Sequence, residues 1–190
     1  ASLSLERHRL LWLYLQRESN FFDSKQSMLH VAPEQCFYGR FRKLKNLDYL
    51  TADLDSPIAD VKMDIHDIQY GDNHFDVIFC NHVLEHVTDD RQCMRELCRV
   101  LKPGGLAIMQ VPFKAGQEVT DEDPTITDPE ERIRRFGQYD HVRQYGADYP
   151  KRLAEEGFKV EAYKVREAFS PEEIKRYALM DGEVLYVCSK

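Results

Sequence analysis

The segment from residue 64 to residue 87 reads DIHDIQYGDNHFDVIFCNHVLEHV. Within it, residues 75–80 (FDVIFC) form a nearly continuous apolar run, the pattern of a strand that is covered on both faces. After a helical stretch, residues 97–112 read LCRVLKPGGLAIMQVP. Here Pro103-Gly104-Gly105 is predicted to stop the helix, and residues 106–111 are predicted to form a second buried strand. Strand, helix and strand in this order indicate one unit of a parallel sheet.

The same alternation continues on both sides of this unit. Thr88 is predicted to cap the intervening helix, and residues 170–173 (SPEE) form a capping box that opens another. Residues 114–128 are polar and acidic without periodicity, which predicts a long loop. The pattern predicts an α/β fold with a doubly wound, mostly parallel sheet. Further strands are expected at 28–32, 47–54, 61–65, 159–165 and 184–189, and further helices at 5–17, 37–44 and 148–156.

Length, charge and cysteine content set broad limits. A chain of 190 residues favours a single domain. We divide it into an N-terminal helical segment (1–26), a cofactor-binding half (27–113) and an acceptor-side half (114–190). The formal charge is −7, so a nucleic acid or an anionic membrane is not expected as the main partner. The five cysteines are odd in number and include no C-x-x-C, which favours reduced thiols and a cytoplasmic location.

Polar residues follow three of the predicted strands. Asp53 closes the strand at 47–54, Asp64 closes the strand at 61–65, and Asn81 follows the strand at 75–80. In doubly wound sheets, ligands bind at the carboxyl ends of the strands. A carboxylate there can accept both hydroxyls of a ribose diol. Either aspartate alone is better explained as a solvated turn residue, but their joint placement at successive strand ends favours a ligand site.

This ordered set resembles the class I S-adenosylmethionine-dependent methyltransferases, most closely their type 11 group. The resemblance is carried by the acid at Asp64, Phe75-Asp76 at the start of a strand, the string N-H-V-L-E-H at 81–86, and L-K-P-G-G at 101–105. It implies a Rossmann-like sheet of seven strands with an antiparallel last strand and helices on both faces. It also implies S-adenosylmethionine as the cofactor and S-adenosylhomocysteine as the product.

The resemblance assigns roles to residues by position. Asp53, with Leu54 beside it, is expected to bind the ribose hydroxyls. Asp64 is expected to accept from the adenine amino group, and Ile65 to pack on the ring. The remaining candidates, expected nearer the methionine part of the cofactor and its methyl group, are His30, Ala32, Glu34, Cys80, Asn81 and His82.

The sequence departs from the family at the first loop. A glycine-rich loop is usual there, because glycine lets the backbone approach the cofactor closely. The matching positions here read Ala32-Pro33-Glu34-Gln35-Cys36, after His30 where an acid is usual. Because the other strand-end residues are present, we interpret this as a rebuilt loop that still binds the cofactor. We expect Glu34 to meet the cofactor's α-amino group; a solvent-facing acid remains the alternative.

A metal site is the competing interpretation of residues 82–86. His82, Glu85 and His86 form an H-x-x-E-H string, which in zinc proteases places two histidines on one helix face with a glutamate as general base. Here the next helix begins at about Thr88, so the string lies in a short connection rather than in a long helix. This favours a strand-end loop, and no metal is expected.

Candidate acceptor-side residues lie at 136–146 (FGQYDHVRQYG). Tyr139, Arg143 and Tyr145 are candidates for binding the acceptor, and His141 and His86 are candidates for removing its proton. We expect a methyltransferase that acts on a small-molecule acceptor. Two alternatives stay open: a cofactor-binding scaffold of the same fold without turnover, and a zinc hydrolase.

Overall fold

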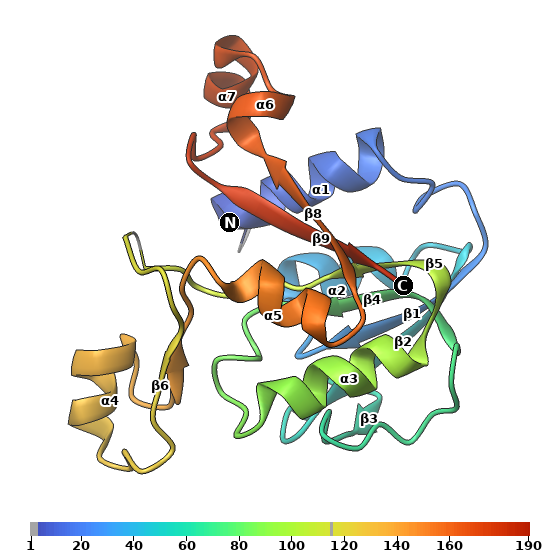
Figure 1. Ribbon diagram of the computed structural model, residues 1–190. Coiled ribbons are helices and arrows are strands. Elements are labelled where there is room, and N and C mark those ends of the chain that lie inside the picture. Colours follow the sequence, from blue (N-terminus) through green and yellow to red (C-terminus); the bar gives the residue numbers. More distant parts are fainter. Residues whose placement is uncertain (1–3, 115) are drawn as a thin grey trace.

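Seven strands form one sheet in a computed structural model that describes residues 4–114 and 116–190 (Figure 1). Their order across the sheet is β3-β2-β1-β4-β5-β9-β8. Strands from β3 to β5 run parallel, and β9 lies antiparallel between β5 and β8. The expected doubly wound, Rossmann-like sheet is therefore confirmed. The strands are β1 (Gln26–Val31), β2 (Leu47–Asp53), β3 (Val61–Lys62), β4 (Phe75–Cys80), β5 (Leu101–Ile108), β8 (Lys159–Lys164) and β9 (Val184–Ser189).

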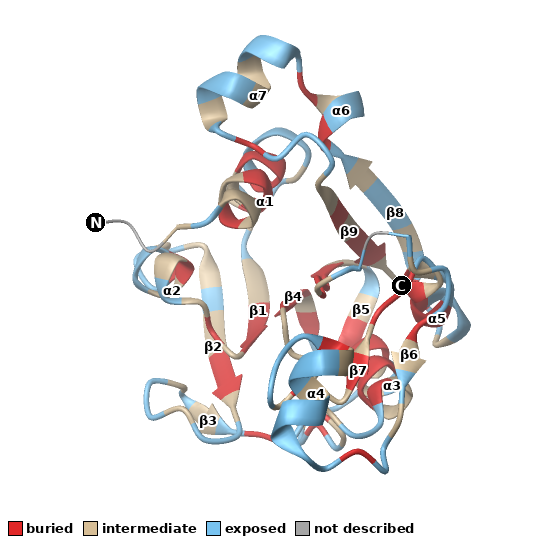
Figure 2. Ribbon diagram, turned by 90° about the vertical axis from the view of Figure 1, so that its left-hand side faces the viewer, coloured by how far each residue is buried: buried red, intermediate tan, exposed pale blue. Residues whose placement is uncertain are grey.

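Helices cover both faces of this sheet, because successive side chains of a buried strand point to opposite faces. Leu29 of β1 belongs to the same hydrophobic cluster as Met94 of α3. Its neighbour Met28 belongs to a second cluster with Leu11 of α1 and Phe41 of α2. Figure 2 shows the central strands largely buried and α4 and α7 largely exposed. The helices are α1 (Glu6–Arg17), α2 (Gln35–Phe41), α3 (Asp90–Val100), α4 (Pro129–Phe136), α5 (Tyr149–Glu155), α6 (Val165–Ala168) and α7 (Pro171–Tyr177).

The connection from α3 to β5 differs from the prediction. Asp89, not Thr88, caps α3, because its carboxylate accepts a hydrogen bond from the Gln92 amide at 2.9 Å. The segment Pro103-Gly104-Gly105 does not stop the helix; it lies inside β5 as an irregularity in the pairing with β4. A Cβ atom on Gly105 would lie 2.9 Å from the carbonyl oxygen of Asp76, so only glycine fits this close approach.

The segment after β5 holds more structure than its sequence predicted. Within the expected loop, β6 (Asp121–Glu122) pairs antiparallel with β7 (Arg143–Gln144). Helix α4 lies between them, and α6 follows β8; neither was predicted. The capping box at Ser170 is confirmed. In residues 4–114 and 116–190, no helix has both the length and the apolarity needed to cross a membrane.

Candidate functional site

A cavity of about 380 Å³ lies at the carboxyl ends of β1, β2 and β3. Parallel strands bring their carboxyl ends to the same edge of a sheet, which is why residues far apart in sequence meet there. The cavity is lined by five of the residues predicted to bind a cofactor, namely Ala32, Asp53, Leu54, Asp64 and Ile65, and by the predicted catalytic residue His86. Sequence reasoning missed its other walls, Val31, Met63, His66, Val83, Val87 and Thr88, because nothing in these residue types marks a ligand site.

The two aspartates of the cavity share one arrangement. Oδ1 of Asp53 accepts the backbone amides of Asp55 and Ser56, both at 2.9 Å. Oδ1 of Asp64 lies 2.9 Å from the backbone nitrogen of His66 and 2.6 Å from its Nδ1. These bonds from the His66 backbone and ring lower the pKa of Asp64. Among the described residues, Oδ2 of each aspartate has no hydrogen bond, so each acid keeps one oxygen for a ligand.

The loop that lacks glycine retains a glycine-like backbone. Ala32 has φ of +47°, in the left-handed region that a side chain rarely adopts. Its amide donates to the carbonyl of Ala52 at 2.8 Å, which ties the end of β1 to β2. His82, which follows β4, also has a positive φ, of +54°. Such strain costs about 1–3 kcal/mol per residue and persists at sites where the surrounding structure holds it.

Glu34 lies in a polar network rather than on the cavity wall. Its Oε1 is 2.8 Å from Nε2 of His8, and its Oε2 accepts from Asn81 Nδ2 at 3.1 Å. Nε2 of the fully buried His30 lies 3.7 Å from Oε2. Burial by itself raises the pKa of Glu34, but its bonds to His30, His8 and Asn81 hold that pKa well below its usual value. The carboxylate is therefore charged and joins α1, β1 and the end of β4.

Glu34→Gln is expected to lower the free energy of unfolding near pH 7 by about 1–3 kcal/mol, because the charged bonds are lost. Since the folded pKa is depressed, the stabilisation is complete above about pH 4.5 and falls as the pH drops toward the folded value. The difference in Tm between the wild type and Glu34→Gln should therefore shrink from pH 6 to pH 3. Glu172→Gln, at an exposed position of α7, is the control. A pH-independent difference would contradict the assignment.

The other predicted cofactor residues also lie off the described cavity wall. Cys80 is fully buried in the core, and burial raises the pKa of its thiol well above the usual value. Asn81 is buried between Glu34 and Gln110. The backbone amide of Gln110 donates to Asn81 Oδ1 at 3.2 Å. His82 is held by a 2.7 Å bond from its amide to the Gln110 carbonyl. These residues join the ends of β4 and β5 beside the cavity.

The predicted acceptor-binding residues take different positions. Tyr139 is 60% exposed. Arg143 is buried, and its guanidinium donates to the backbone carbonyls of Leu84, Val87 and Thr88. Tyr145 is fully buried, with its hydroxyl 2.7 Å from Asp90 Oδ2. The side chains of Arg143 and Tyr145 therefore hold the connection between β4 and α3.

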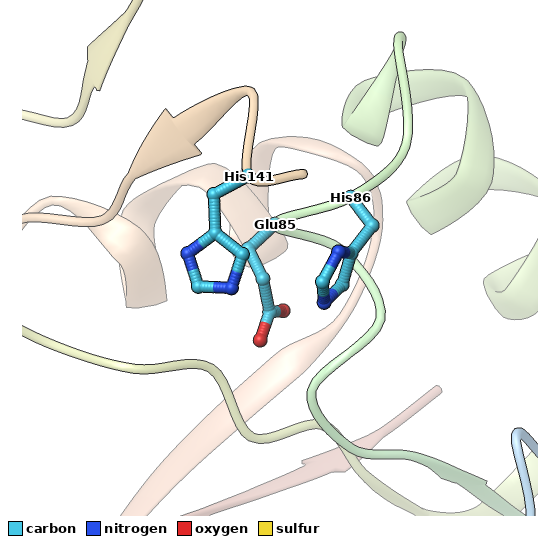
Figure 3. A group of neighbouring side chains, drawn as sticks. All are labelled: Glu85, His86 and His141. Carbon is cyan, nitrogen blue, oxygen red and sulfur yellow. The ribbon is translucent and has the colours of Figure 1, made fainter. Parts of the chain in front are cut away.

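His86 and His141 are brought together although 55 residues separate them in sequence. Their ring centroids lie 4.7 Å apart at an interplanar angle of 85°, with Glu85 beside them (Figure 3). One ligand atom each of Glu85, His86 and His141 lies within 4.8 Å of the other two. His82 is not a member of that group, although its Nδ1 lies 3.4 Å from Glu85 Oε1, so the trio His82, Glu85 and His86 of the zinc-hydrolase interpretation is not the one that the structure brings together.

Comparisons with known proteins agree with this fold. A family model described as a methyltransferase domain matches residues 22–109, which include β1 to β5. The uncharacterized methyltransferase YcgJ of Bacillus subtilis (strain 168) is 30% identical over 77 residues, which span 40% of this chain and only 28% of that protein.

Solved structures extend the likeness across most of the chain. The [4+2]-cyclase SpnF has a TM-score of 0.64 at 18% identity, with 96% of this chain and 80% of that chain covered. Haemonchus contortus phosphoethanolamine N-methyltransferase 2, solved with S-adenosylhomocysteine, has a TM-score of 0.59 at 14% identity, with 97% and 53% covered. An S-adenosylmethionine-dependent methyltransferase from Mesorhizobium loti has a TM-score of 0.52 at 13% identity, with 88% and 92% covered. The match over residues 22–109, a little under half of the chain, and the shared fold make this chain similar to the class I S-adenosylmethionine-dependent methyltransferases.

Proposed function

We propose that the chain binds S-adenosylmethionine in the cavity at the ends of β1, β2 and β3 and transfers its methyl group to a small-molecule acceptor. The observation that carries this proposal is the pair of aspartates, each with one oxygen left without a partner among the described residues. Oδ2 of Asp53 is placed to accept the ribose hydroxyls, and Oδ2 of Asp64 the adenine amino group. Met63, Ile65 and Val83 supply apolar surface against which an adenine ring can pack.

The cofactor, when bound, would supply a methyl group on a positively charged sulfur. An acceptor atom would attack the methyl carbon in line with the carbon–sulfur bond, and S-adenosylhomocysteine would leave. The chain's contribution is then mainly to position the two reactants. The charged Glu34 carboxylate lies just after β1 and off the cavity wall, bonded to His8 and Asn81, and we propose that its negative charge attracts the α-amino group from there. His86 lines the cavity, and its ring contacts that of His141. We propose that these imidazoles take the proton of the acceptor.

The choice of acceptor class rests on charge. A net charge of −7 opposes binding of a polyanion such as nucleic acid. We therefore favour an uncharged or cationic small molecule with an oxygen or nitrogen nucleophile.

A scaffold that binds the cofactor without turnover is the second candidate. Two observations favour it: no glycine occupies the first loop, and a neighbour in fold, SpnF, is named a cyclase rather than a methyltransferase. A shared fold does not fix the chemistry. Binding of the cofactor without any methyl transfer would favour this candidate.

Calorimetric titration of the purified chain with S-adenosylmethionine and S-adenosylhomocysteine tests the first step. We expect one site per chain with a micromolar Kd, and circular dichroism of the same sample establishes that it is folded. Release of S-adenosylhomocysteine is then measured against phenols, amines and hydroxy acids. A folded sample that binds neither ligand would overturn the proposal.

A further inference from the structure

A cluster of three metal-type ligands lies beside the cavity. Glu85 and His86 come from the connection between β4 and α3, and His141 from the segment between α4 and β7 (Figure 3). One donor atom from each lies within 4.8 Å of the other two. The two segments are fixed to each other by a 2.9 Å bond from the Val142 amide to the Glu85 carbonyl. The cluster is therefore held by backbone pairing as well as by its side chains.

The carboxylate of Glu85 is the unusual member. Glu85 is only 1% exposed, and the Oε2 atom of its carboxylate is buried without a hydrogen-bond partner among the described residues. Its Oε1 lies 3.4 Å from Nδ1 of His82. An unpaired buried carboxylate oxygen is costly, so such groups usually pair with a cation or bind a metal. Figure 3 shows this carboxylate pointing into the space between the two imidazoles.

Each histidine of the cluster has an oxygen beside one ring nitrogen. Nδ1 of His86 lies 3.3 Å from Oδ2 of Asp140, and Nδ1 of His141 lies 3.1 Å from the Phe136 carbonyl. Both oxygens are acceptors, so they favour the tautomer with the proton on Nδ1. The lone pair is then on Nε2, and this is the arrangement that metal-binding histidines usually have.

We propose that Glu85, His86 and His141 form a binding site for a divalent transition-metal cation, with Zn²⁺ the best match. Two imidazoles and one carboxylate are the ligand set of zinc sites that keep a fourth position open, whereas Mg²⁺ and Ca²⁺ prefer oxygen alone. Zinc bonds of about 2.0–2.1 Å place the donors of a tetrahedral site roughly 3.3 Å apart, so the cluster contracts when it binds the cation.

The site has a direct relation to the cavity, because His86 belongs to both. A cation on His86 lies at the edge of the proposed cofactor site. Its open position would accept an oxygen ligand, such as a hydroxyl of the acceptor, and would make that hydroxyl more acidic. This second role, unlike the metal site itself, rests on the proposed function. It would replace His86 and His141 as the groups that take the acceptor's proton.

Titration of chelator-treated protein with Co²⁺ and Zn²⁺ tests the site. We expect one Co²⁺ per chain, with visible absorption bands that Zn²⁺ abolishes on displacing it, and a rise of Tm with Zn²⁺ concentration. Glu85→Gln and His141→Gln should each weaken Co²⁺ binding at least tenfold. His74→Gln, at an exposed histidine outside the cluster, should leave it unchanged. Circular dichroism of each variant excludes loss of folding as the cause.

Two results would overturn the inference: no stoichiometric metal on the wild type, or binding that survives both substitutions. Titration of the same samples with S-adenosylmethionine separates this proposal from the first. Metal binding without cofactor binding would overturn the proposed function and leave the metal site standing. Cofactor binding without metal binding would overturn the metal site and leave the proposed function standing.

Discussion

Asp53→Ala is expected to weaken S-adenosylmethionine binding by about 100-fold or more. Two charge-assisted hydrogen bonds to the ribose diol are lost, each worth about 1.5–3 kcal/mol, and about 1.4 kcal/mol corresponds to a factor of ten. The loss should appear in the Kd from calorimetry, for S-adenosylmethionine and S-adenosylhomocysteine alike, because both carry the ribose.

The design must separate this contact from the structural role of Asp53, whose Oδ1 holds the following turn. Asp53→Asn keeps an oxygen acceptor for the turn and removes the charge, so an intermediate loss of about tenfold is expected. Asp55→Ala is the matched control, because this aspartate lies on the same turn and is largely exposed. Among the described residues its carboxylate pairs only with Lys62, at 3.6 Å. Its Kd should stay within about twofold of the wild type.

Equal Kd values for Asp53→Ala and the wild type would show that the ribose lies elsewhere. Asp64→Ala provides a second check, since its effect should be smaller, about tenfold, for a single hydrogen bond to the adenine amino group. If both aspartates proved neutral in a chain that binds the cofactor, the cavity at β1 to β3 would be the wrong site.

The sheet was the most predictable part of this chain. Strands buried on both faces need apolar side chains on both, so residues 75–80 and 184–189 stand out as runs and coincide with β4 and β9. The ends of α3 were less predictable. Thr88 and Asp89 are both good capping residues, and only the backbone geometry places the Asp89 carboxylate on the Gln92 amide.

The site was predictable only where the fold fixes it. Asp53 and Asp64 follow strands, so their position at the sheet edge follows from topology. Arg143 and Tyr145 could not be assigned, because a polar side chain in a loop serves a ligand or the core equally well. The role of such a side chain depends on a partner that is distant in sequence, as Asp90 is for Tyr145. The pairing of His86 with His141 likewise depends on β6 and β7, which are too short to leave a pattern.

Arg152→Ala is expected to lower the free energy of unfolding by about 3–5 kcal/mol, because it leaves the buried Asp90 carboxylate without its main cation. Asp90 is 2% exposed and Arg152 9%. Nη2 of Arg152 lies 2.9 Å from Asp90 Oδ1 and 3.0 Å from Oδ2, and Nη1 lies 3.1 Å from Glu122 Oε1. Although burial acts to lower the pKa of Arg152, the bonds to these two acids raise it, so the guanidinium stays charged.

The measurement is thermal or urea unfolding followed by circular dichroism. For a chain of this size the loss corresponds to a fall in Tm of roughly 10 °C. Lys151→Ala, at the neighbouring position of α5, is the control: its side chain is largely exposed, with only a 3.8 Å pair to Glu155, so a change below about 0.5 kcal/mol is expected. Equal effects of Arg152→Ala and Lys151→Ala would contradict the buried network.

A double variant separates the lost charge pair from simple loss of packing. Adding Asp90→Asn to Arg152→Met removes the unpaired charge while the amide oxygen can still accept from Tyr145, so part of the lost stability should return. The consequence extends to the site, because the Tyr145 hydroxyl also lies 3.2 Å from the Leu84 carbonyl oxygen, in the connection that carries His86. Arg152→Ala should therefore weaken Co²⁺ binding at Glu85, His86 and His141 under conditions in which the chain is still folded. Lys151→Ala should leave the affinity for Co²⁺ unchanged.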